Sequence, residues 1–401
     1  MINPFKEALP ILKKIEEAGY EAYFVGGAVR DHLLNIQIND IDIASSATPE
    51  EIKAIFPHTI DVGIAHGTVM VIWNQDTYEI TSFRTESTYL DYRRPEQVFF
   101  VRELKEDLKR RDFTINAMAM DKNGQIIDYF NGEDALKKKE IKTVGNPNER
   151  FQEDALRMMR GIRFVSTLGF QVEKETLKGI VDNQQLLSKI AVERITAEFE
   201  KLLQGRWCSD ALEIMIETKL YRFLPMLESA EKAISQLAKL HLTKLELPEK
   251  WAVLLLCMGV KDKQQIEMFL RAWKLSVKQI KTVQKIIYWI LQREQMPTWS
   301  RQALYFATLS IAVSAEKIYQ LLWNQEICSD ISSIEEQYRK LPIKSKEELA
   351  ISGNDLLRWT EKRPGPWIKD VLSLVESKVV EQKLPNDKQL IKEWLQRCHQ
   401  I

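Results

Sequence analysis

The sequence predicts an α+β fold, in which a head that mixes strands and helices around one mixed sheet is followed by an all-helical half. Up to about residue 145, short apolar runs with period two alternate with helical patterns. Beyond residue 150 strand signals almost vanish and helical patterns continue to the end. A chain of 401 residues is too long for one core, so two to four units are expected.

Composition excludes several classes of protein. Basic and acidic residues are equal in number, 57 of each, so any binding to a polyanion must depend on local basic faces. The longest uncharged apolar run, residues 252–260, is far shorter than the ~20 residues that cross a bilayer. We therefore expect no membrane association.

The N-terminus and the cysteines point to a cytoplasmic protein. An early acid, Glu7, and a helix start at Asn3-Pro4 do not fit a signal peptide. The cysteines have no paired spacing, which argues against a disulfide framework or a zinc site. They are Cys208, Cys257, Cys328 and Cys398. We expect reduced thiols in the cytoplasm.

The first informative stretch is a pair of glycines after a short strand. Residues 23–25 form an apolar strand, and Gly26 and Gly27 follow where a helix begins near Ala28. Backbone N–H groups at a helix start attract anions, and residues without Cβ let a phosphate approach. Arg30 adds a positive charge in the first turn.

Asp40 and Asp42 follow, in a segment that alternates polar and apolar residues like a half-buried strand. Period two places both carboxylates on one face. Two acids this close repel each other unless a divalent cation lies between them, and such oxygen sites suit Mg²⁺. The alternative is an exposed strand edge with an Asx turn.

The next elements are a capped helix and a hairpin. Thr48 caps a helix over residues 49–55, and strands are expected over residues 67–73 and 77–83 with a turn between them. Glu79 lies on the second strand. It supplies a third carboxylate if this strand pairs beside Asp42, and is otherwise an exposed strand residue.

Periodicity disappears between residues 84 and 97. This stretch contains Asp91, Arg93 and Arg94 and is rich in charge and tyrosine. It is either a lid or lever for the nearby site or a solvated connector. Residues 98–101 return to strand.

A helix is expected over residues 110–120. Asp112 and Asn116 are four apart and would share one face, which suits two hydrogen bonds to a ribose. Arg111 lies just before the helix and can face phosphates. The alternative is a helix cap at Asp112 and a surface charge at Arg111.

A second informative helix is expected over residues 153–164. Its predicted apolar face consists of Ala155, Met158, Met159 and Ile162. The opposite face carries Glu153, Arg157 and Arg160, flanked by Asp154 and Arg163. Asp154 and Arg157 together offer two acceptor oxygens and a fork of donors, although an ordinary intrahelical ion pair is the alternative.

Helices continue over residues 192–199 and beyond, with breaks near Gly205 and at several Leu-Pro and Met-Pro steps. Residues 352–359 and 361–369 combine glycine turns with basic residues. They could hold a phosphate backbone or be capped surface turns.

Four of these stretches resemble, in type and order, the motifs of the class II tRNA nucleotidyltransferases, the bacterial CCA-adding enzymes. They are Gly-Gly-Ala-Val-Arg-Asp at 26–31, Asp-Ile-Asp at 40–42, Arg-Arg-Asp-Phe-Thr-Ile-Asn at 110–116 and Glu-Asp-Ala-Leu-Arg-Met-Met-Arg at 153–160. The resemblance implies a polymerase-β-like nucleotidyltransferase head. It also implies template-independent addition of CCA to tRNA from CTP and ATP, with two Mg²⁺ ions and release of pyrophosphate.

The resemblance also implies roles for individual residues. Asp40 and Asp42 hold the metal ions, and Glu79 is an auxiliary catalytic carboxylate. Nucleotide binding falls to Gly26, Gly27, Arg30, Arg111, Asp112, Asn116, Asp154, Arg157, Arg160 and Arg163. Asp154 and Arg157 face the base, and Asp91, Arg93 and Arg94 belong to a flexible loop used for the switch to A addition.

The resemblance further implies a nucleotidyltransferase head (1–148), a neck that recognises the base (149–214), a helical body (215–315) and a tail (316–401) that binds the acceptor and TψC side of tRNA. A homodimer is left open. The alternatives are a poly(A) polymerase, a partial enzyme that adds only CC or only A, and a non-catalytic RNA-binding relative.

Overall fold

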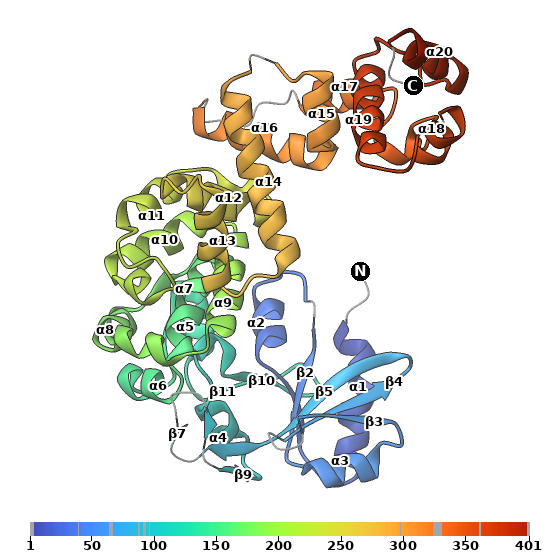
Figure 1. Ribbon diagram of the computed structural model, residues 1–401. Coiled ribbons are helices and arrows are strands. Elements are labelled where there is room, and N and C mark those ends of the chain that lie inside the picture. The colour runs from blue at the N-terminus through green and yellow to red at the C-terminus, as the bar shows by residue number, and fades with distance from the viewer. Residues whose placement is uncertain are drawn as a thin grey trace. The chain divides into compact units, whose positions relative to one another are not determined.

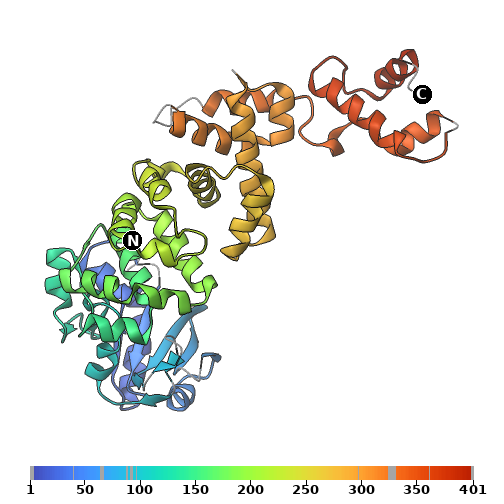
Figure 2. The ribbon, with the colours of Figure 1, turned by 60° about the vertical axis from the view of Figure 1, so that its left-hand side comes forward.

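The computed structural model describes residues 4–38, 40–63, 67–86, 89–90, 94–95, 97–296, 298–323, 331–360 and 362–398. The chain forms two compact units, Met1–Ala238 with Ala272–Lys274, and Lys239–Arg271 with Leu275–Ile401. The first unit holds the sheet and its helices, and the second holds helices (Figures 1 and 2). The predicted α+β class, with a mixed sheet followed by helices, is therefore confirmed. The four-part division of the chain stays a prediction.

The sheet of the first unit has seven strands in the order β11-β10-β1-β2-β5-β4-β3. Their bounds are β1 Ala22–Val25, β2 Asp42–Ser45, β3 Thr59–Gly63, β4 Thr68–Trp73, β5 Asp76–Ser82, β10 Met118–Met120 and β11 Ile126–Asp128. Strands β2 and β5 run parallel, and the other neighbours run antiparallel. Because β1, β2 and β5 are central, the segments at their ends can share one site.

Three short strand pairs complete the first unit. They are β6 Arg84–Glu86 with β9 Val98–Phe100, β7 Tyr89–Leu90 with β8 Arg94–Pro95, and β12 Glu140–Ile141 with β13 Gln171–Val172. Of the expected loop residues, Asp91 and Arg93 lie outside the described residues, and Arg94 begins β8.

The helices of the first unit cover the sheet and extend beyond it (Figure 1). They are α1 Pro4–Glu17, α2 Gly27–Leu33, α3 Pro49–Ile55, α4 Leu104–Lys109, α5 Gly132–Lys138, α6 Pro147–Glu153, α7 Leu156–Leu168, α8 Lys174–Asn183, α9 Val192–Gln204, α10 Cys208–Glu217 and α11 Glu231–Ala238. Helix α7 packs against α9 and α10. A core cluster that includes Val25, Phe83 and Leu108 joins α4 to the sheet.

Local signals located several elements correctly. Thr48 caps α3 and forms a capping box with Glu51, as its position before Pro49 predicts. The glycine pair lies between β1 and α2, and Gly26 has a φ of 71°. This left-handed backbone favours glycine because it carries no Cβ.

The structure corrects the prediction that Asp40 and Asp42 share one strand. Strand β2 begins at Asp42, so Asp40 precedes it. Both side chains are exposed. Strand β1 ends at Val25, opposite Asp42, and α2 begins at Gly27, so β1 offers Asp40 no partner.

The prediction of a helix over residues 110–120 is also wrong. Helix α4 ends at Lys109, a 3₁₀ turn spans Thr114–Asn116, and residues 118–120 form β10 inside the sheet. Met118, Ala119 and Met120 are all buried between β1 and β11. Pairing on both sides of β10 satisfies its backbone groups, which outweighs helical propensity here.

The single helix expected over residues 153–164 is in fact two helices. Helix α6 ends at Glu153, Asp154 has an extended backbone, and α7 begins at Leu156. The apolar face is confirmed, since Ala155, Met158, Met159 and Ile162 are all fully buried. Arg157, expected on the opposite face, is only 8% exposed. The break turns its side chain toward the head.

The second unit is helical throughout its described residues. Its helices are α12 Leu247–Cys257, α13 Lys263–Ala272, α14 Val277–Glu294, α15 Arg301–Ala307, α16 Leu309–Trp323, α17 Ile331–Arg339, α18 Gly353–Trp359, α19 Trp367–Val380 and α20 Lys388–Arg397. Helix α14 packs against α12 and α16. Helices α18 and α19 follow the two glycine turns noted in the sequence.

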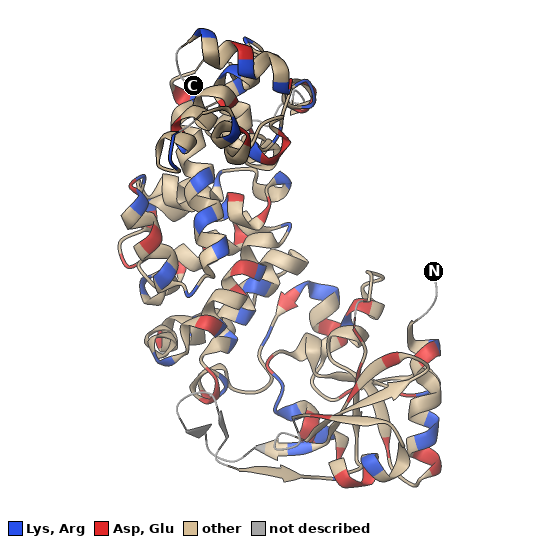
Figure 3. Cartoon of the chain, turned by 45° about the vertical axis from the view of Figure 1, so that its right-hand side comes forward, with Lys and Arg blue, Asp and Glu red and all other residues tan. Residues whose placement is uncertain are grey.

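Charge and hydropathy agree with the expectations from composition. Basic and acidic side chains are interspersed in both units (Figure 3). In the part of the chain that the structure describes, every helix is too short or too polar to span a bilayer.

Candidate active site

The carboxylates predicted to bind metal line an open cavity at one edge of the central strands. Asp42 is in register with Glu79 across the parallel pair β2–β5. Asp40, Asp42 and Glu79 all line a cavity of about 500 Å³. Glu79 is thus a neighbour of Asp42, as expected if its strand paired there.

Acidic side chains line this cavity, and the charge of Asp40 affects the ionisation of Asp42. Desolvation raises the pKa of Asp42, the nearby Arg111 lowers it, and the Asp40 carboxylate raises it, with a net upward shift. Among the described residues, no group of three His, Cys, Asp or Glu side chains gathers closely enough to hold a metal on its own. Metal binding by Asp40 and Asp42 stays a prediction.

The glycine turn, Asp42 and Arg111 meet at one point. A Cβ added to Gly26 would lie 3.0 Å from Nη1 of Arg111 and 3.7 Å from Oδ2 of Asp42. The absence of a side chain at Gly26 thus leaves space between a guanidinium and a carboxylate. Such a gap beside a guanidinium has room for a phosphate group.

A buried acid holds the arginines of the third motif. Asp107 is fully buried and accepts hydrogen bonds from Arg110 at 2.7 Å and from Arg111 at 3.3 Å. Burial would raise the pKa of Asp107, but the charges of Arg110 and Arg111 outweigh this and lower it. The Nε atom of Arg111 is buried without a hydrogen-bond partner.

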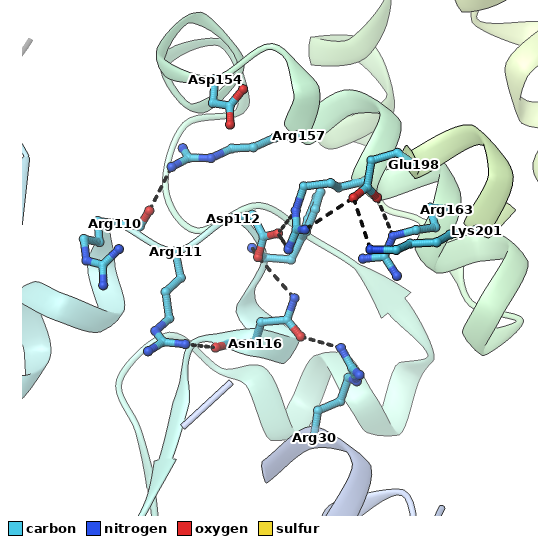
Figure 4. A network of polar contacts seen from close by, with 12 residues as sticks. Arg30, Arg110, Arg111, Asp112, Asn116, Asp154, Arg157, Arg163, Glu198 and Lys201 are labelled. Atoms are coloured by element: carbon cyan, nitrogen blue, oxygen red, sulfur yellow. Dashed lines mark hydrogen bonds and ion pairs between the residues drawn. The ribbon is translucent and has the colours of Figure 1, made fainter. Parts of the chain in front are cut away.

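Asp112 is the hub of a polar network that extends from α2 to α9 (Figure 4). Its Oδ1 accepts from the Asn116 amide at 3.1 Å, and its Oδ2 accepts from Nη2 of Arg160 at 2.7 Å. The side-chain oxygen Oδ1 of Asn116 in turn accepts from Nη1 of Arg30 at 2.7 Å. Four predicted nucleotide-binding residues from three separate motifs are thus in direct contact.

The charge on Asp112 is strongly stabilised. Its burial would raise the pKa, but Arg160 and the hydrogen bond from Asn116 bring it down to about 2. Asp112 in turn raises the pKa of Arg160. The pair therefore stays ionised, and most of its hydrogen-bonding capacity is already used inside the protein.

The remaining arginines surround an acid and an aromatic ring. Glu198 on α9 accepts from Nε of Arg163 at 2.6 Å and lies 3.8 Å from Arg160. The guanidinium groups of Arg163, Arg160 and Arg30 lie 4.0, 5.8 and 5.3 Å from the centre of the Phe164 ring. Phe164 thus orders three cations by cation–π contact.

Asp154 and Arg157 each have a separate counter-charge. Arg157 donates to Glu153 at 2.6 Å and to the Arg110 carbonyl at 2.9 Å. Asp154 pairs with Arg194 on α9 at 2.8 Å. Figure 4 shows the two side chains near each other above the Arg110–Arg111 backbone.

Residues 110–112 join the two halves of the predicted site. Arg111 lies beside Asp42, Asp112 holds Arg160, and the Arg110 carbonyl accepts from Arg157. The carboxylate cavity and the pair predicted to face the base are therefore linked through three consecutive residues.

Comparison with known proteins agrees with this geometry. Sequence models of protein families match residues 22–142 as "Poly A polymerase head domain", residues 169–231 as "Probable RNA and SrmB- binding site of polymerase A" and residues 243–395 as tRNA nucleotidyltransferase domain 2. A CCA-adding enzyme of Bacillus cytotoxicus is 48% identical over 98% of this chain and 99% of its own length. The chain belongs to the CCA-adding enzyme family.

Other members and solved structures are consistent with this assignment. A CCA-adding enzyme of Bacillus cereus is 46% identical over the same share of each chain. The crystal structure of the Bacillus stearothermophilus CCA-adding enzyme in complex with CTP has a TM-score of 0.91 and 43% identity, and covers 100% of this chain and 98% of that one. A Thermotoga maritima CCA-adding enzyme complexed with tRNA shares the fold, with a TM-score of 0.66 at 21% identity over 99% of this chain and 96% of that one.

Sequence reasoning did not assign four residues that serve as ion-pair partners for the predicted site residues. They are Asp107, Glu153, Glu198 and Arg194. Asp107 could have been found, because it lies three and four residues before Arg110 and Arg111. Arg194 and Glu198 gave no local signal, since their partners are 40 and 35 residues away.

Proposed function

We propose that this member of the CCA-adding enzyme family adds and repairs the 3′-terminal CCA of tRNA, using CTP and ATP without a nucleic-acid template and releasing pyrophosphate. The observation that carries the proposal is that residues 110–112 lie between the two parts of the site: Arg111 is close enough to Asp42 to lower its pKa, and the Arg110 carbonyl accepts a hydrogen bond from Arg157. One bound nucleotide can thereby have its phosphates near the carboxylates and its base near α7. A tRNA substrate implies work in the cytoplasm.

The donor set of the cavity fits a hard divalent cation. Asp40 and Asp42 are exposed carboxylates beside an open cavity, and desolvation together with the Asp40 charge raises the pKa of Asp42 despite the nearby Arg111. We propose that they hold Mg²⁺. When bound, such ions lower the pKa of the tRNA 3′-hydroxyl and neutralise charge on the triphosphate.

The residues of the chain supply phosphate binding and alignment. Arg111, held by Asp107, contacts the triphosphate next to Gly26, where a Cβ would obstruct it. Asn116 and Asp112 adjoin the sugar and hold Arg30 and Arg160 in place. Alignment of the 3′-oxygen with the α-phosphate then depends on a preorganised set of charges.

Base selection follows from hydrogen-bond chemistry. Cytosine and adenine each present an amino donor beside a ring-nitrogen acceptor. Asp154 accepts from the amino group, and Arg157 donates to the ring nitrogen. Uracil and guanine present a carbonyl and an N–H at these places, so both contacts are mismatched and the buried polar groups lose their partners.

The proposal is tested by incubating the protein with tRNA that lacks CCA and with each nucleotide, separately and together. We expect two additions with CTP alone and three with CTP and ATP. Long adenylate runs on arbitrary RNA would identify a poly(A) polymerase instead, and addition of only CC or only A would identify a partial enzyme. Either result rejects the proposal.

Variants of the carboxylates separate an enzyme from a non-catalytic RNA-binding relative. Asp40→Ala and Asp42→Ala should lower turnover on the order of 10³-fold or more, because a metal contributes several kcal/mol to the transition state. Binding of tRNA, measured by filter retention, should be largely kept. Unchanged turnover in both variants would contradict a metal role for these residues.

A further inference from the structure

Asp154 lies at a break between two helices, where its direction is not fixed by helical geometry. It ends α6 with an extended backbone (φ −138°, ψ 102°), and α7 begins two residues later. Its Oδ1 accepts from the Leu156 N–H at 3.1 Å, which fixes one oxygen only. The plane of the carboxylate therefore needs a second contact.

Arg194 supplies that contact from another helix. Its Nη2 lies 2.8 Å from Oδ2 of Asp154, and its Nη1 lies 3.3 Å from Oδ1. The two side chains are 27% and 17% exposed, so solvent weakens the pair only in part. A two-pronged contact fixes the carboxylate plane as well as its charge.

The helix that carries Arg194 is itself well anchored. Within the first unit, Glu198 pairs with Arg163 of α7, and the Thr196 hydroxyl donates to the Trp273 carbonyl at 2.8 Å. The Phe199 ring packs on Trp273 with centroids 4.6 Å apart. Arg194 therefore projects from a rigid support toward Asp154.

The contact leaves capacity for a base. An ionised carboxylate offers about four acceptor positions. The Leu156 N–H and Nη1 of Arg194 use Oδ1, and Nη2 of Arg194 uses one position on Oδ2. A position on Oδ2 remains for an amino group, and an acceptor placed there does not pair with a carbonyl.

Separate counter-charges also keep the pair Asp154/Arg157 from neutralising itself. An acid and an arginine three residues apart readily form their own ion pair. Here Arg194 engages Asp154, and Glu153 engages Arg157 at 2.6 Å. Without Arg194, the Asp154 carboxylate has a cation only three residues away to which it can turn.

We propose that Arg194 is a positioning residue for nucleotide selection: its guanidinium holds the Asp154 carboxylate in the orientation that accepts from the amino group of cytosine or adenine. This inference rests on the proposed function. A merely structural tie between α9 and the α6–α7 junction would lower turnover with all four nucleotides alike. A positioning role changes their ratio.

The test measures kcat/KM for CTP and for UTP on tRNA that lacks CCA. Arg194→Met keeps most of the side-chain volume and removes the charge. It should lower the preference for CTP over UTP about tenfold or more, mainly through faster UTP use relative to CTP. Arg194→Lys keeps a charge without the fork and should lower the preference less.

A double variant shows whether Arg194 acts through Asp154. Asp154→Ala alone should reduce the preference for CTP. Adding Arg194→Met should then change it by less than about twofold, because the carboxylate to be positioned is already gone. If the double variant loses CTP preference by the product of the two single-variant factors, the inference is overturned.

Lys201→Met is the matched control. Lys201 is on the same helix and is 59% exposed; its Nζ lies 4.0 Å from Oε1 of Glu198, at the outer limit of an ion pair, so this variant removes one positive charge from α9 without touching Asp154. Its preference for CTP should equal that of the wild type. If Arg194→Met fails to fold by circular dichroism, Arg194→Lys decides, and an unchanged ratio there overturns the inference. Failure of the wild type to add C, C and A would instead overturn the proposed function.

Discussion

Replacing Asp112 by asparagine tests the network that links the nucleotide-binding motifs. The substitution keeps the shape of the side chain and removes its charge. Oδ2 of Asp112 accepts from both Nε and Nη2 of Arg160, at 2.8 and 2.7 Å. If the asparagine NH₂ replaces Oδ2, it places donors against the two N–H donors of Arg160. If its oxygen replaces Oδ2, the NH₂ takes the place of Oδ1 and faces the Asn116 amide donor.

The expected loss of stability is about 2 to 3 kcal/mol at pH 7. Removing one partner of a buried ion pair costs about 3–5 kcal/mol, because the other charge is left unpaired. The lower end applies here, since the Arg160 side chain is 34% exposed and keeps Glu198 at 3.8 Å. Water and Glu198 thus compensate for part of the lost interaction.

The effect should depend on pH with a defined sign. The folded-state pKa of Asp112 is about 2, below its ordinary value of 3.8, so its ionised form stabilises the fold. This contribution, about 2 kcal/mol, is complete above pH 4 and is lost as the pH falls from about 4 to about 2. At pH 3 the wild type should have lost about 1 kcal/mol of this stabilisation, so the difference in stability between the wild type and Asp112→Asn should be smaller than at pH 7.

Hydrogen exchange of α7 amides, followed by mass spectrometry over a urea series, measures the opening free energy at pH 7 and pH 3. Asp61→Asn is the control, because the Asp61 side chain is 51% exposed in its pair with Lys53 and should matter by less than about 1 kcal/mol. Equal protection of wild type and Asp112→Asn at pH 7, or a gap that does not narrow at pH 3, would refute the reasoning.

Three further predictions concern base choice and packing. Arg157→Ala should raise misincorporation of UTP more than it slows CTP addition, and an unchanged CTP and ATP preference would contradict its role at the base. Gly205→Ala should destabilise the first unit by about 2 to 3 kcal/mol, seen as a lower melting temperature, because its Cβ would lie 2.1 Å from Oγ of Ser166. Glu316→Gln should lower the free energy of unfolding, measured by urea denaturation, by about 3 kcal/mol. The Nε of Arg293 lies 2.7 Å from Oε2 of Glu316 in the wild type, and the variant leaves this guanidinium without its buried counter-charge. A urea midpoint equal to that of the wild type would contradict this prediction.

Short-range patterns predicted the parts of the fold that depend on neighbours in the chain. The cap of α3 at Thr48 and the buried face of α7 follow from residues within two turns of one another. The acidic pair and the glycine turn were found from residue type and spacing. The same reasoning failed where a sheet imposed its own geometry, as in β10.

The site shows the same limit. Asp112 and Asn116 do contact each other, but across a 3₁₀ turn rather than along a helix. Arg157 is buried because the chain breaks at Asp154 and turns it toward the Arg110 carbonyl. Neither feature has a signature in local periodicity.

The sequence by itself determined the fold class, the order of the motifs and the chemical types that they carry, because helical and strand periods and hydrogen-bonding groups are local properties. Only the tertiary structure decided which opposite charge each arginine and acid would receive. Arg194 and Asp154 are 40 residues apart, and Arg160 and Asp112 are 48 apart. Such pairings depend on how whole helices pack and on the desolvation that follows, which no short stretch of sequence specifies.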